Sequence, residues 1–282
     1  MRKSIFLLLL FFVCAFFFTT GCVDKKGDAS DSIMSDTLMS DTTQEDSLSG
    51  LVEEEPMPAA ADELFDDFFF NYAASRKVQK ERTMFPLDVN TYGKESKMEA
   101  TQWKRERFFM PQGYYTLIFH KPSQMKLVND TSVNEVTVER ISIKQSNVTR
   151  WHFLRTRGMW RMNKISYTSL GQHPDAGFIR FYQRFATDTA FQQKSLAETV
   201  SITAPDPDDD FSTMTGDIMP EQWPMFAPWM PSGNIYNIVY GAQPYPASHT
   251  RYFLIRGIAN GLQTDLVFVR SGKTWKLTKM TN

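Results

Sequence analysis

The sequence predicts an α+β fold in two tandem copies, each with helices packed on one face of a curved antiparallel sheet. Two observations support this prediction. An aromatic stretch begins each half of the chain, at residues 62–72 and 175–185, and the aromatic positions coincide when 113 is subtracted from the second set of numbers. In each half, helical patterns come first and sequential strand patterns follow, which is typical of α+β domains.

The aromatic stretches have the spacing of a buried helix face. Apolar residues recur at i, i+3, i+4 and i+7, which forms one stripe on an α-helix. The first copy has Phe65, Phe68, Phe69 and Tyr72, and the second copy has Phe178, Phe181, Tyr182 and Phe185. Asp62 and Asp175 precede these stretches, and we expect both to cap their helices. Phe68 and Phe181 should be equivalent buried residues.

Further elements follow in the first copy. Residues 88–93 are rich in turn formers, and residues 97–109 suggest a second short helix that ends before Pro111. Strand patterns follow at 114–120, 133–144, 151–155 and 160–167. Helices followed by sequential strands should give an antiparallel sheet with the helices on one face.

The second copy repeats these steps. Gln222-Trp223 matches Gln102-Trp103 with an offset of 120, and residues 268–280 match 153–165 with an offset of 115. Because the offset between matching residues changes along the chain, the second copy must contain extra residues, which we place near 204–216, in a predicted loop. We therefore expect a signal peptide at 1–21, a tether at 22–60 and two domains at 61–171 and 172–282. Each domain should have its own core and its own sheet.

The aromatic first helix, the terminal strand with Trp160 or Trp275 after a glycine turn, and the unit of about 110 residues resemble the nuclear transport factor 2-like cone fold. The tandem arrangement behind an export signal resembles a group of Bacteroidetes lipoproteins known only as a domain of unknown function. The resemblance covers residues 62–282. It implies two cone-like domains, each with the central pocket that is usual for this fold.

The N-terminus indicates export and lipid anchoring. Arg2 and Lys3 precede an apolar run at residues 5–18, as in a secretory signal. A membrane-spanning helix needs roughly 20 apolar residues, and this run is shorter. Gly21-Cys22 resembles the end of a lipoprotein box, although Thr19 stands where Leu is usual. We expect lipidation at Cys22, membrane attachment through that anchor, and a location in the cell envelope, facing the periplasm or the cell surface.

Composition separates a tether from the folded body. Residues 23–60 carry ten acidic side chains against two lysines and no aromatic residue, which is the signature of disorder. Residues 61–282 carry 27 basic and 22 acidic side chains, and their Lys and Arg do not cluster with aromatics. This pattern argues against a nucleic-acid partner. The other cysteine, Cys14, lies in the signal, so the mature chain cannot form an internal disulfide.

No catalytic motif, cofactor fingerprint or metal-ligand spacing is present. The four histidines are scattered, and we expect His120 and His152 to be hydrogen-bonded structural residues. Asp66 and Asp67 should lie on the charged face of the first helix, in solvent. Residues 206–217 imitate a calcium loop, but Phe211 stands where the loop requires glycine, so a solvated loop is the better reading. We therefore predict no catalytic residues, no cofactor and no metal.

The most unusual stretch is residues 223–231, where prolines keep large rings on irregular backbone. These rings could bind a small hydrophobic or sugar-like ligand or a peptide, or they could plug the open end of the cone as core. The candidate contacts are Trp223, Phe226, Trp229, Tyr236, Tyr182, Trp103 and His152. The second copy is more apolar at this place, so a functional pocket is expected within residues 175–282, with Trp229 as the preferred contact.

These observations favour a lipid-anchored binding module for a small molecule, peptide or envelope partner. One alternative is an isomerase or dehydratase with a desolvated acid or histidine in one pocket. Another is a structural envelope protein with filled pockets. An empty aromatic pocket would favour binding, a titratable group deep in an empty pocket would favour catalysis, and filled cones would favour the structural role.

Overall fold

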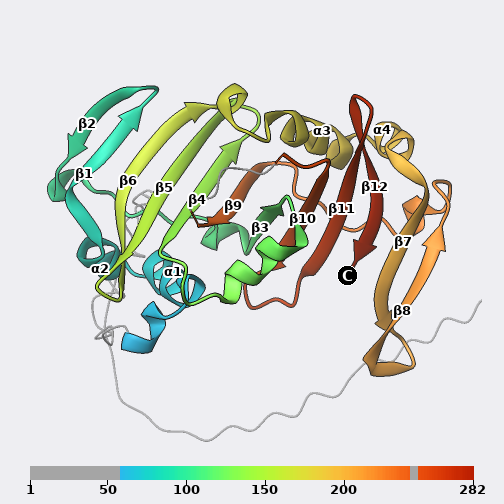
Figure 1. Ribbon diagram of the computed structural model, residues 1–282, viewed down its shortest axis with the longest axis horizontal. Helices are drawn as coiled ribbons and strands as arrows, with labels where there is room; N and C mark the ends of the chain where they lie inside the picture. Colours follow the sequence, from blue (N-terminus) through green and yellow to red (C-terminus); the bar gives the residue numbers. More distant parts are fainter. Residues whose placement is uncertain (1–57, 242–246) are drawn as a thin grey trace, which may run out of the picture. The chain divides into compact units, whose positions relative to one another are not determined.

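The strands of the two halves form a single mixed sheet. The computed structural model describes residues 58–241 and 247–282 (Figure 1). The strands are β1 (Thr83–Thr91), β2 (Lys94–Met98), β3 (Tyr114–Phe119), β4 (Glu135–Ser142), β5 (Asn147–Thr156), β6 (Met159–Ser169), β7 (Leu196–Asp206), β8 (Asp209–Ile218), β9 (Asn234–Tyr240), β10 (Thr250–Gly257), β11 (Gln263–Ser271) and β12 (Thr274–Thr281). Their order across the sheet is β2-β1-β6-β5-β4-β9-β3-β10-β11-β12-β7-β8.

The two central strands, β3 and β9, are exchanged between the two halves of the sheet. β3, from the first half, pairs with β10 of the second half, and β9, from the second half, pairs with β4 of the first. β3 and β9 are parallel neighbours, with Thr116 opposite Asn237. The expectation of two separate sheets is therefore wrong: the described residues belong to one twelve-stranded sheet and one compact unit.

Burial on both faces explains why the central strands can serve both halves. A strand covered on both sides reads as a continuous apolar run rather than an alternating one. In β3, Leu117 belongs to the first core and Ile118 to the second; in β9, Ile238 belongs to the first core and Ile235 to the second. Successive side chains point to opposite faces, so the two cores lie on opposite sides of the shared sheet.

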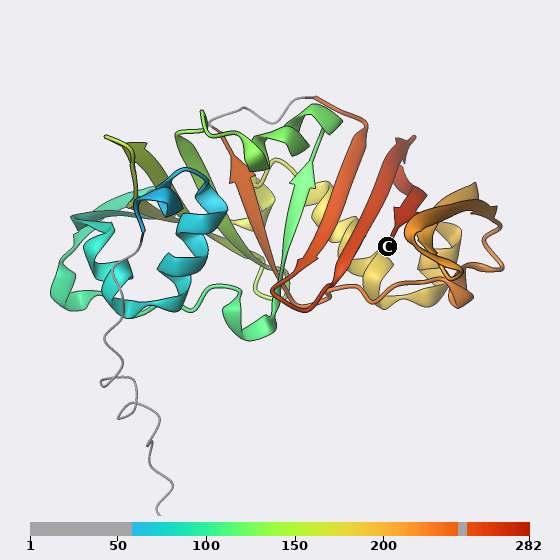
Figure 2. The same cartoon turned by 90° about the horizontal axis from the view of Figure 1, so that it is seen from below.

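The helices are α1 (Phe65–Ala74), α2 (Arg76–Glu81), α3 (Ala176–Thr187) and α4 (Thr189–Lys194). Figure 2 shows α1 and α3 on opposite faces of the sheet. Each long helix ends where an extended residue, Ser75 or Asp188, caps the short helix that follows by accepting a hydrogen bond from a backbone N–H. The expected caps at the start of the long helices are wrong, because neither Asp62 nor Asp175 makes a side-chain capping bond.

Aromatic rings fill both cone interiors. Phe65 packs against Phe153 and Trp160 with ring centroids 5.4 and 5.1 Å apart, and Tyr182 stacks on Phe253 at 4.0 Å. Phe68 and Phe181 are both buried, as predicted. The helices therefore pack directly on the curved sheet, and the α+β cone-like architecture that the sequence predicts is confirmed.

Three local predictions need correction. Residues 97–109 do not form a helix: β2 ends at Met98, and only a short 3-10 turn follows at Ala100–Gln102. The turn-rich residues 88–93 belong to a β1–β2 hairpin that the sequence pattern did not reveal. The extra residues near 204–216 lengthen the corresponding β7–β8 hairpin and do not form a loop. The expected strands at 114–120, 133–144, 151–155 and 160–167 are present as β3 to β6.

The strand order of the sheet is symmetric between the two halves. Each strand of β1–β6 corresponds to the strand of β7–β12 whose number is six higher, and exchanging the corresponding strands gives the same order counted from the opposite edge. The parallel pairs β1–β6 and β7–β12 occupy matching positions, and the exchange of β3 and β9 is mutual. The internal repeat thus has a counterpart in strand pairing, although its two units share one sheet.

Candidate functional site

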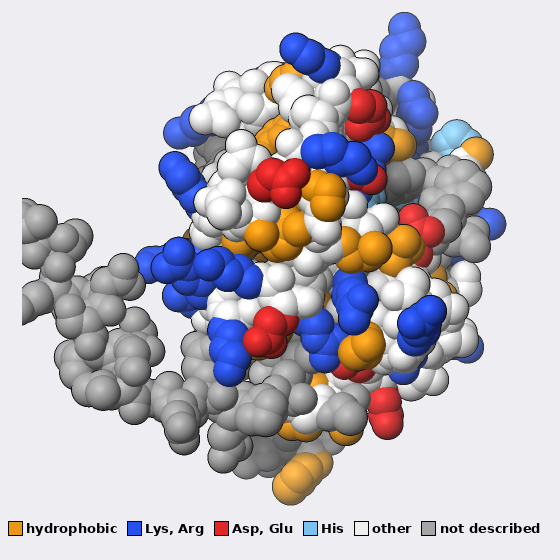
Figure 3. Space-filling view, turned by 90° about the vertical axis from the view of Figure 1, so that its left-hand side faces the viewer, with side chains coloured by type: hydrophobic (Ala, Val, Ile, Leu, Met, Phe, Trp, Pro, Cys, Tyr) orange, Lys and Arg blue, Asp and Glu red, His pale blue; other side chains and the backbone are white. Residues whose placement is uncertain are grey.

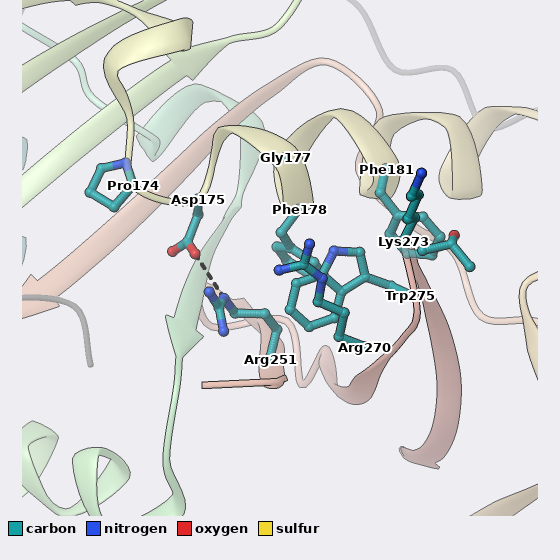
Figure 4. Close-up of a pocket in the computed structure, with 10 residues that line it drawn as sticks. Pro174, Asp175, Gly177, Phe178, Phe181, Arg251, Arg270, Lys273 and Trp275 are labelled. Carbon is teal, nitrogen blue, oxygen red and sulfur yellow. Dashed lines mark hydrogen bonds and ion pairs between the residues drawn. The ribbon is translucent and has the colours of Figure 1, made fainter. Parts of the chain in front are cut away.

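A pocket of about 220 Å³ opens beside the first turns of α3 (Figure 4). It lies between the start of this helix, the start of β10 and the β11–β12 hairpin. Its lining residues are Pro174, Asp175, Gly177, Phe178, Phe181, Arg251, Arg270, Lys273, Thr274 and Trp275. A second pocket, of about 340 Å³, shares Pro174, Arg251 and Arg270 with the first and adds His120, Ser248 and His249. The pocket is therefore part of a larger basic depression.

A buried carboxylate anchors the pocket. Asp175 accepts one hydrogen bond from the ring of His120 at 2.8 Å and another from Nε of Arg251 at 2.7 Å. Burial alone would raise the pKa of Asp175, but the hydrogen bond from His120 and the charge of Arg251 outweigh it and hold the pKa below its usual value. Asp175 is thus ionised, and its charge is balanced by Arg251 inside the protein.

Arg251 is held in one orientation. Its Nη1 donates to the backbone carbonyls of Ser248 and Thr250 at 3.0 and 2.8 Å. Its guanidinium also lies over the ring of Trp275, 5.0 Å from the centroid. These contacts and the bond to Asp175 fix the guanidinium at the wall of the pocket (Figure 4).

Two further cationic side chains at the pocket have no carboxylate partner in the described part of the chain. Arg270, at the end of β11, and Lys273, in the turn before β12, are exposed. Gly272 permits this tight turn through its positive φ of 61°. Within residues 58–241 and 247–282, no ion pair is formed by either side chain. The pocket therefore has an excess of positive charge above the rings of Phe178 and Trp275.

The first half uses its matching carboxylate differently. Asp62 accepts two hydrogen bonds from Arg82, at 2.9 and 3.1 Å, and a third from the backbone N–H of Trp160. The residue at the position of Arg82 in the second half is Ser195, whose side chain is too short to form such an ion pair. Asp175 instead forms its ion pair with Arg251 of β10. No further carboxylate of the described residues lines the pocket to pair with Arg270 and Lys273 of the β11–β12 hairpin.

A second buried polar cluster joins the two halves near the central strands. Glu139 accepts hydrogen bonds from Arg150 at 2.6 Å, from Asn237 at 3.1 Å and from His173 at 3.2 Å. Nδ1 of His173 accepts from the backbone N–H of Asp175, so the ring proton is on Nε2. Burial would raise the pKa of Glu139, but the hydrogen bond from His173 and the charge of Arg150 lower it to about 2. These groups all have partners, so the cluster serves structure.

The prediction for Asp66 is wrong, because this residue does not lie in solvent. The hydroxyl of Tyr240 donates to its carboxylate at 2.5 Å, and burial raises its pKa to about 6. Its neighbour Asp67 is exposed, as expected. The cavity beside Tyr240 has a volume of only about 20 Å³, which holds about one water molecule. A desolvated acid is therefore present, but it lines neither this cavity nor the two pockets near α3.

The predicted aromatic contacts are dispersed over the structure. Trp103 and Tyr236 lie in the first core, whereas Trp223 and Tyr182 lie in the second. Phe226 and Trp229 are exposed, and the ring of Trp229 packs on Tyr114 with centroids 4.8 Å apart. None of these side chains lines the pocket beside α3. Their role in ligand binding stays a prediction, and Cys22 lies outside the described residues.

The two histidines expected to be structural have hydrogen-bond partners. His120 bonds Asp175, and His152 lies between the hydroxyls of Thr137 and Ser166 at 3.1 and 2.9 Å. Burial, together with the charges of Arg150 and Lys164, lowers the pKa of His152 to about 4, so its ring is neutral at physiological pH.

No side-chain cluster suited to a metal, and no helix able to cross a membrane, occurs in the parts of the chain that the structure describes. Groups of three or more His, Cys, Asp or Glu at metal-binding geometry are absent there. The helices in those parts are too short or too polar for a membrane span. The acidic residues 206–217 form the tip and outer strand of the β7–β8 hairpin.

The sequence signals for the pocket were weak. Arg270 and Trp275 belong to the terminal stretch, residues 268–280, that repeats residues 153–165 with Arg155 and Trp160, so their likeness to the first half indicates a structural role. Asp175 looked like a helix cap. Only the folded chain brings Arg251, from another strand, to this carboxylate.

Comparison with known proteins gives a family and a fold. Residues 44–282 match the model of a domain of unknown function, DUF4348. The crystal structure of a nuclear transport factor 2-like protein from Bacteroides fragilis superposes with a TM-score of 0.73 and 35% sequence identity, covering 80% of this chain and 98% of that one. No curated protein matches the sequence. The chain belongs to the DUF4348 family, and its fold is nuclear transport factor 2-like.

Proposed function

We propose that the protein is a lipid-anchored binding module of the cell envelope, and that the pocket beside α3 binds a small organic anion with an apolar or aromatic part. The observation that carries this proposal is the pair of cations, Arg270 and Lys273, over a pocket whose own carboxylate is already neutralised. The cone interiors are filled by aromatic rings, as the structural alternative expects, so the binding proposal rests on the pocket beside α3 and not on a central cone pocket. The nuclear transport factor 2-like fold often serves as a scaffold for ligand binding or catalysis, which agrees with a pocket function.

The chemistry of the pocket selects the ligand class. A carboxylate or phosphate group can bind Arg270 and Lys273 through charge-assisted hydrogen bonds. The side chains of Phe178 and Trp275 supply the apolar wall. A volume of about 220 Å³ is below the range of roughly 300–1,000 Å³ that is usual for drug-sized ligands. A compact anion, rather than a polymer or a long lipid chain, suits this space.

Binding is favoured over catalysis because the buried acid of the pocket is already engaged. Asp175 is ionised and accepts bonds from two partners, so it is a poor general base. The isomerase alternative rests on Asp66, whose pKa of about 6 is suitable for proton transfer near neutral pH. Asp66 lines neither the cavity of about 20 Å³ beside Tyr240 nor the two pockets near α3, so none of these spaces would bring a substrate to it.

Calorimetry with benzoate, phenyl phosphate and the neutral benzyl alcohol would test the ligand class. We expect the two anions to bind and the alcohol not to bind. Joint replacement Arg270→Ala and Lys273→Ala should weaken anion binding at least about tenfold, since each tenfold step is only about 1.4 kcal/mol. The matched control is Arg155→Ala, the corresponding hairpin arginine of the first half. Absence of anion binding, or equal binding by the double variant, would refute the proposal.

Anchoring is a separate part of the proposal, and the N-terminal sequence supports it. Gly21-Cys22 follows the apolar run of residues 5–18. Cys22→Ser should release the protein from membranes or leave the precursor uncleaved. Membrane fractionation and N-terminal sequencing would measure this, and unchanged behaviour of the variant in both assays would contradict lipid attachment.

A further inference from the structure

The two outer strands of the sheet differ in how they protect their open edges. An unpaired edge exposes backbone N–H and C=O groups, and proteins commonly guard it with short strands and lysines. β2 has five residues, which include Lys94 and Lys97, and Figure 3 shows many Lys and Arg side chains on that side of the unit. β8, the strand at the other edge, has ten residues and contains neither Lys nor Arg.

The register of the hairpin indicates which backbone groups of β8 point outward. Pro205 of β7 lies opposite Thr213 and has no N–H, so this pair cannot exchange two hydrogen bonds. Bonded and non-bonded pairs alternate along an antiparallel ladder. The N–H and C=O groups of Thr213, Thr215 and Asp217 therefore face the free edge, where no strand follows among residues 58–241 and 247–282.

Apolar side chains accompany this open edge. The side chain of Phe211 is 100% exposed, and those of Met214 and the adjoining Met219 are about half exposed. Large apolar side chains on an exposed edge strand mark a site of strand pairing. By contrast, the strand with the matching position in the first half, β2, has only Met98 as an apolar residue.

Charge identifies the partner. Asp206, Asp208, Asp209 and Asp217 lie in or beside the hairpin, and residues 195–222 contain no Lys or Arg. A second copy would bring an equally acidic hairpin to this edge without a basic side chain to balance it, and pairing about Thr213 would place Asp209 directly opposite Asp217. We propose that the free edge of β8 binds an extended, positively charged polypeptide segment, which adds one strand to the sheet. This surface is separate from the pocket beside α3.

A synthetic nonapeptide with Lys at both ends and alternating Thr and Val between them is a suitable probe. Its labelled form should bind in a fluorescence anisotropy titration and should slow hydrogen exchange at Thr213 and Thr215. The same peptide with Glu at both ends should bind at least about tenfold more weakly, because like charges then oppose each other. A peptide with a central Pro should also bind more weakly, since it lacks one backbone donor.

A pair of variants separates backbone pairing from side-chain effects. Thr215→Pro removes an outward N–H and should abolish peptide binding, whereas Thr215→Val keeps this donor and should bind normally. Circular dichroism would verify folding; if Thr215→Pro does not fold, the proline peptide decides the question. Equal binding of all three peptides, no binding of the Lys peptide, or a dimer in sedimentation that Thr215→Pro disrupts would each overturn the proposal.

Discussion

Replacement of Glu139 by Gln should remove a defined part of the pH dependence of stability. The carboxylate is 1% exposed and accepts hydrogen bonds from Arg150, His173 and Asn237. Its pKa falls from an ordinary value of 4.5 to about 2 in the folded protein. One pKa unit corresponds to about 1.4 kcal/mol, so the lowered pKa contributes about 3 kcal/mol at neutral pH.

The sign of the effect follows from the direction of the shift. Because the folded-state pKa is lowered, the stabilisation is present above pH 4.5 and is lost as the pH falls toward 2. Urea unfolding of the natural protein and of Glu139→Gln, measured between pH 7 and pH 3, should show a free-energy difference that shrinks with falling pH. Glu135→Gln, on the same strand, is the control. A difference that stays constant with pH would refute the reasoning.

Three further predictions concern the cores and the helix starts. Phe68→Ala and Phe181→Ala should each lower the free energy of unfolding by about 3–5 kcal/mol in urea titrations, and a loss below about 1 kcal/mol would contradict their core positions. Asp66→Asn, which keeps an acceptor for Tyr240, should stabilise the protein by up to about 3 kcal/mol at pH 8 but not at pH 4, because the raised pKa of about 6 makes ionisation costly in the folded state. Gly177→Ala should raise stability by about 0.5–1 kcal/mol, since its added Cβ meets no atom within 4 Å and Ala favours the helix; a lowered melting temperature would count against this.

Local periodicity accounts for the parts of the fold that the sequence predicts. The aromatic stripe with Phe68 and the strand patterns of β4 and β6 depend on neighbours within one element, so they can be read directly. β2 was missed because it lies at an edge, is exposed along its length and has no alternating pattern. The exchange of β3 and β9 was missed because both strands are apolar on both faces, and periodicity does not choose between possible partners.

The candidate site was harder to predict because its residues come from separate elements. Asp175 lies where a helix cap is expected, and this local signal hid its pairing with Arg251. The counterpart of Arg251 in the first half is Val136, by the register of β4 with β5 and of β10 with β11. The pocket therefore depends on a residue that differs between the two copies. The effect of such a difference can be judged only when the residues that surround it in the fold are known.

The exchanged strands connect each half to the acidic start of the other half's long helix. His120 directly follows β3 and bonds Asp175 at 2.8 Å, and Tyr240 ends β9 and bonds Asp66 at 2.5 Å. Residues 172–282 alone would lose β3, the partner of β10, and would leave Asp175 without His120. We expect this fragment to lack cooperative unfolding and anion binding, and mixing it with residues 61–171 should restore both. Calorimetry of each fragment and of the mixture would measure this. An isolated second half that unfolds cooperatively and binds benzoate would show that the exchange is dispensable.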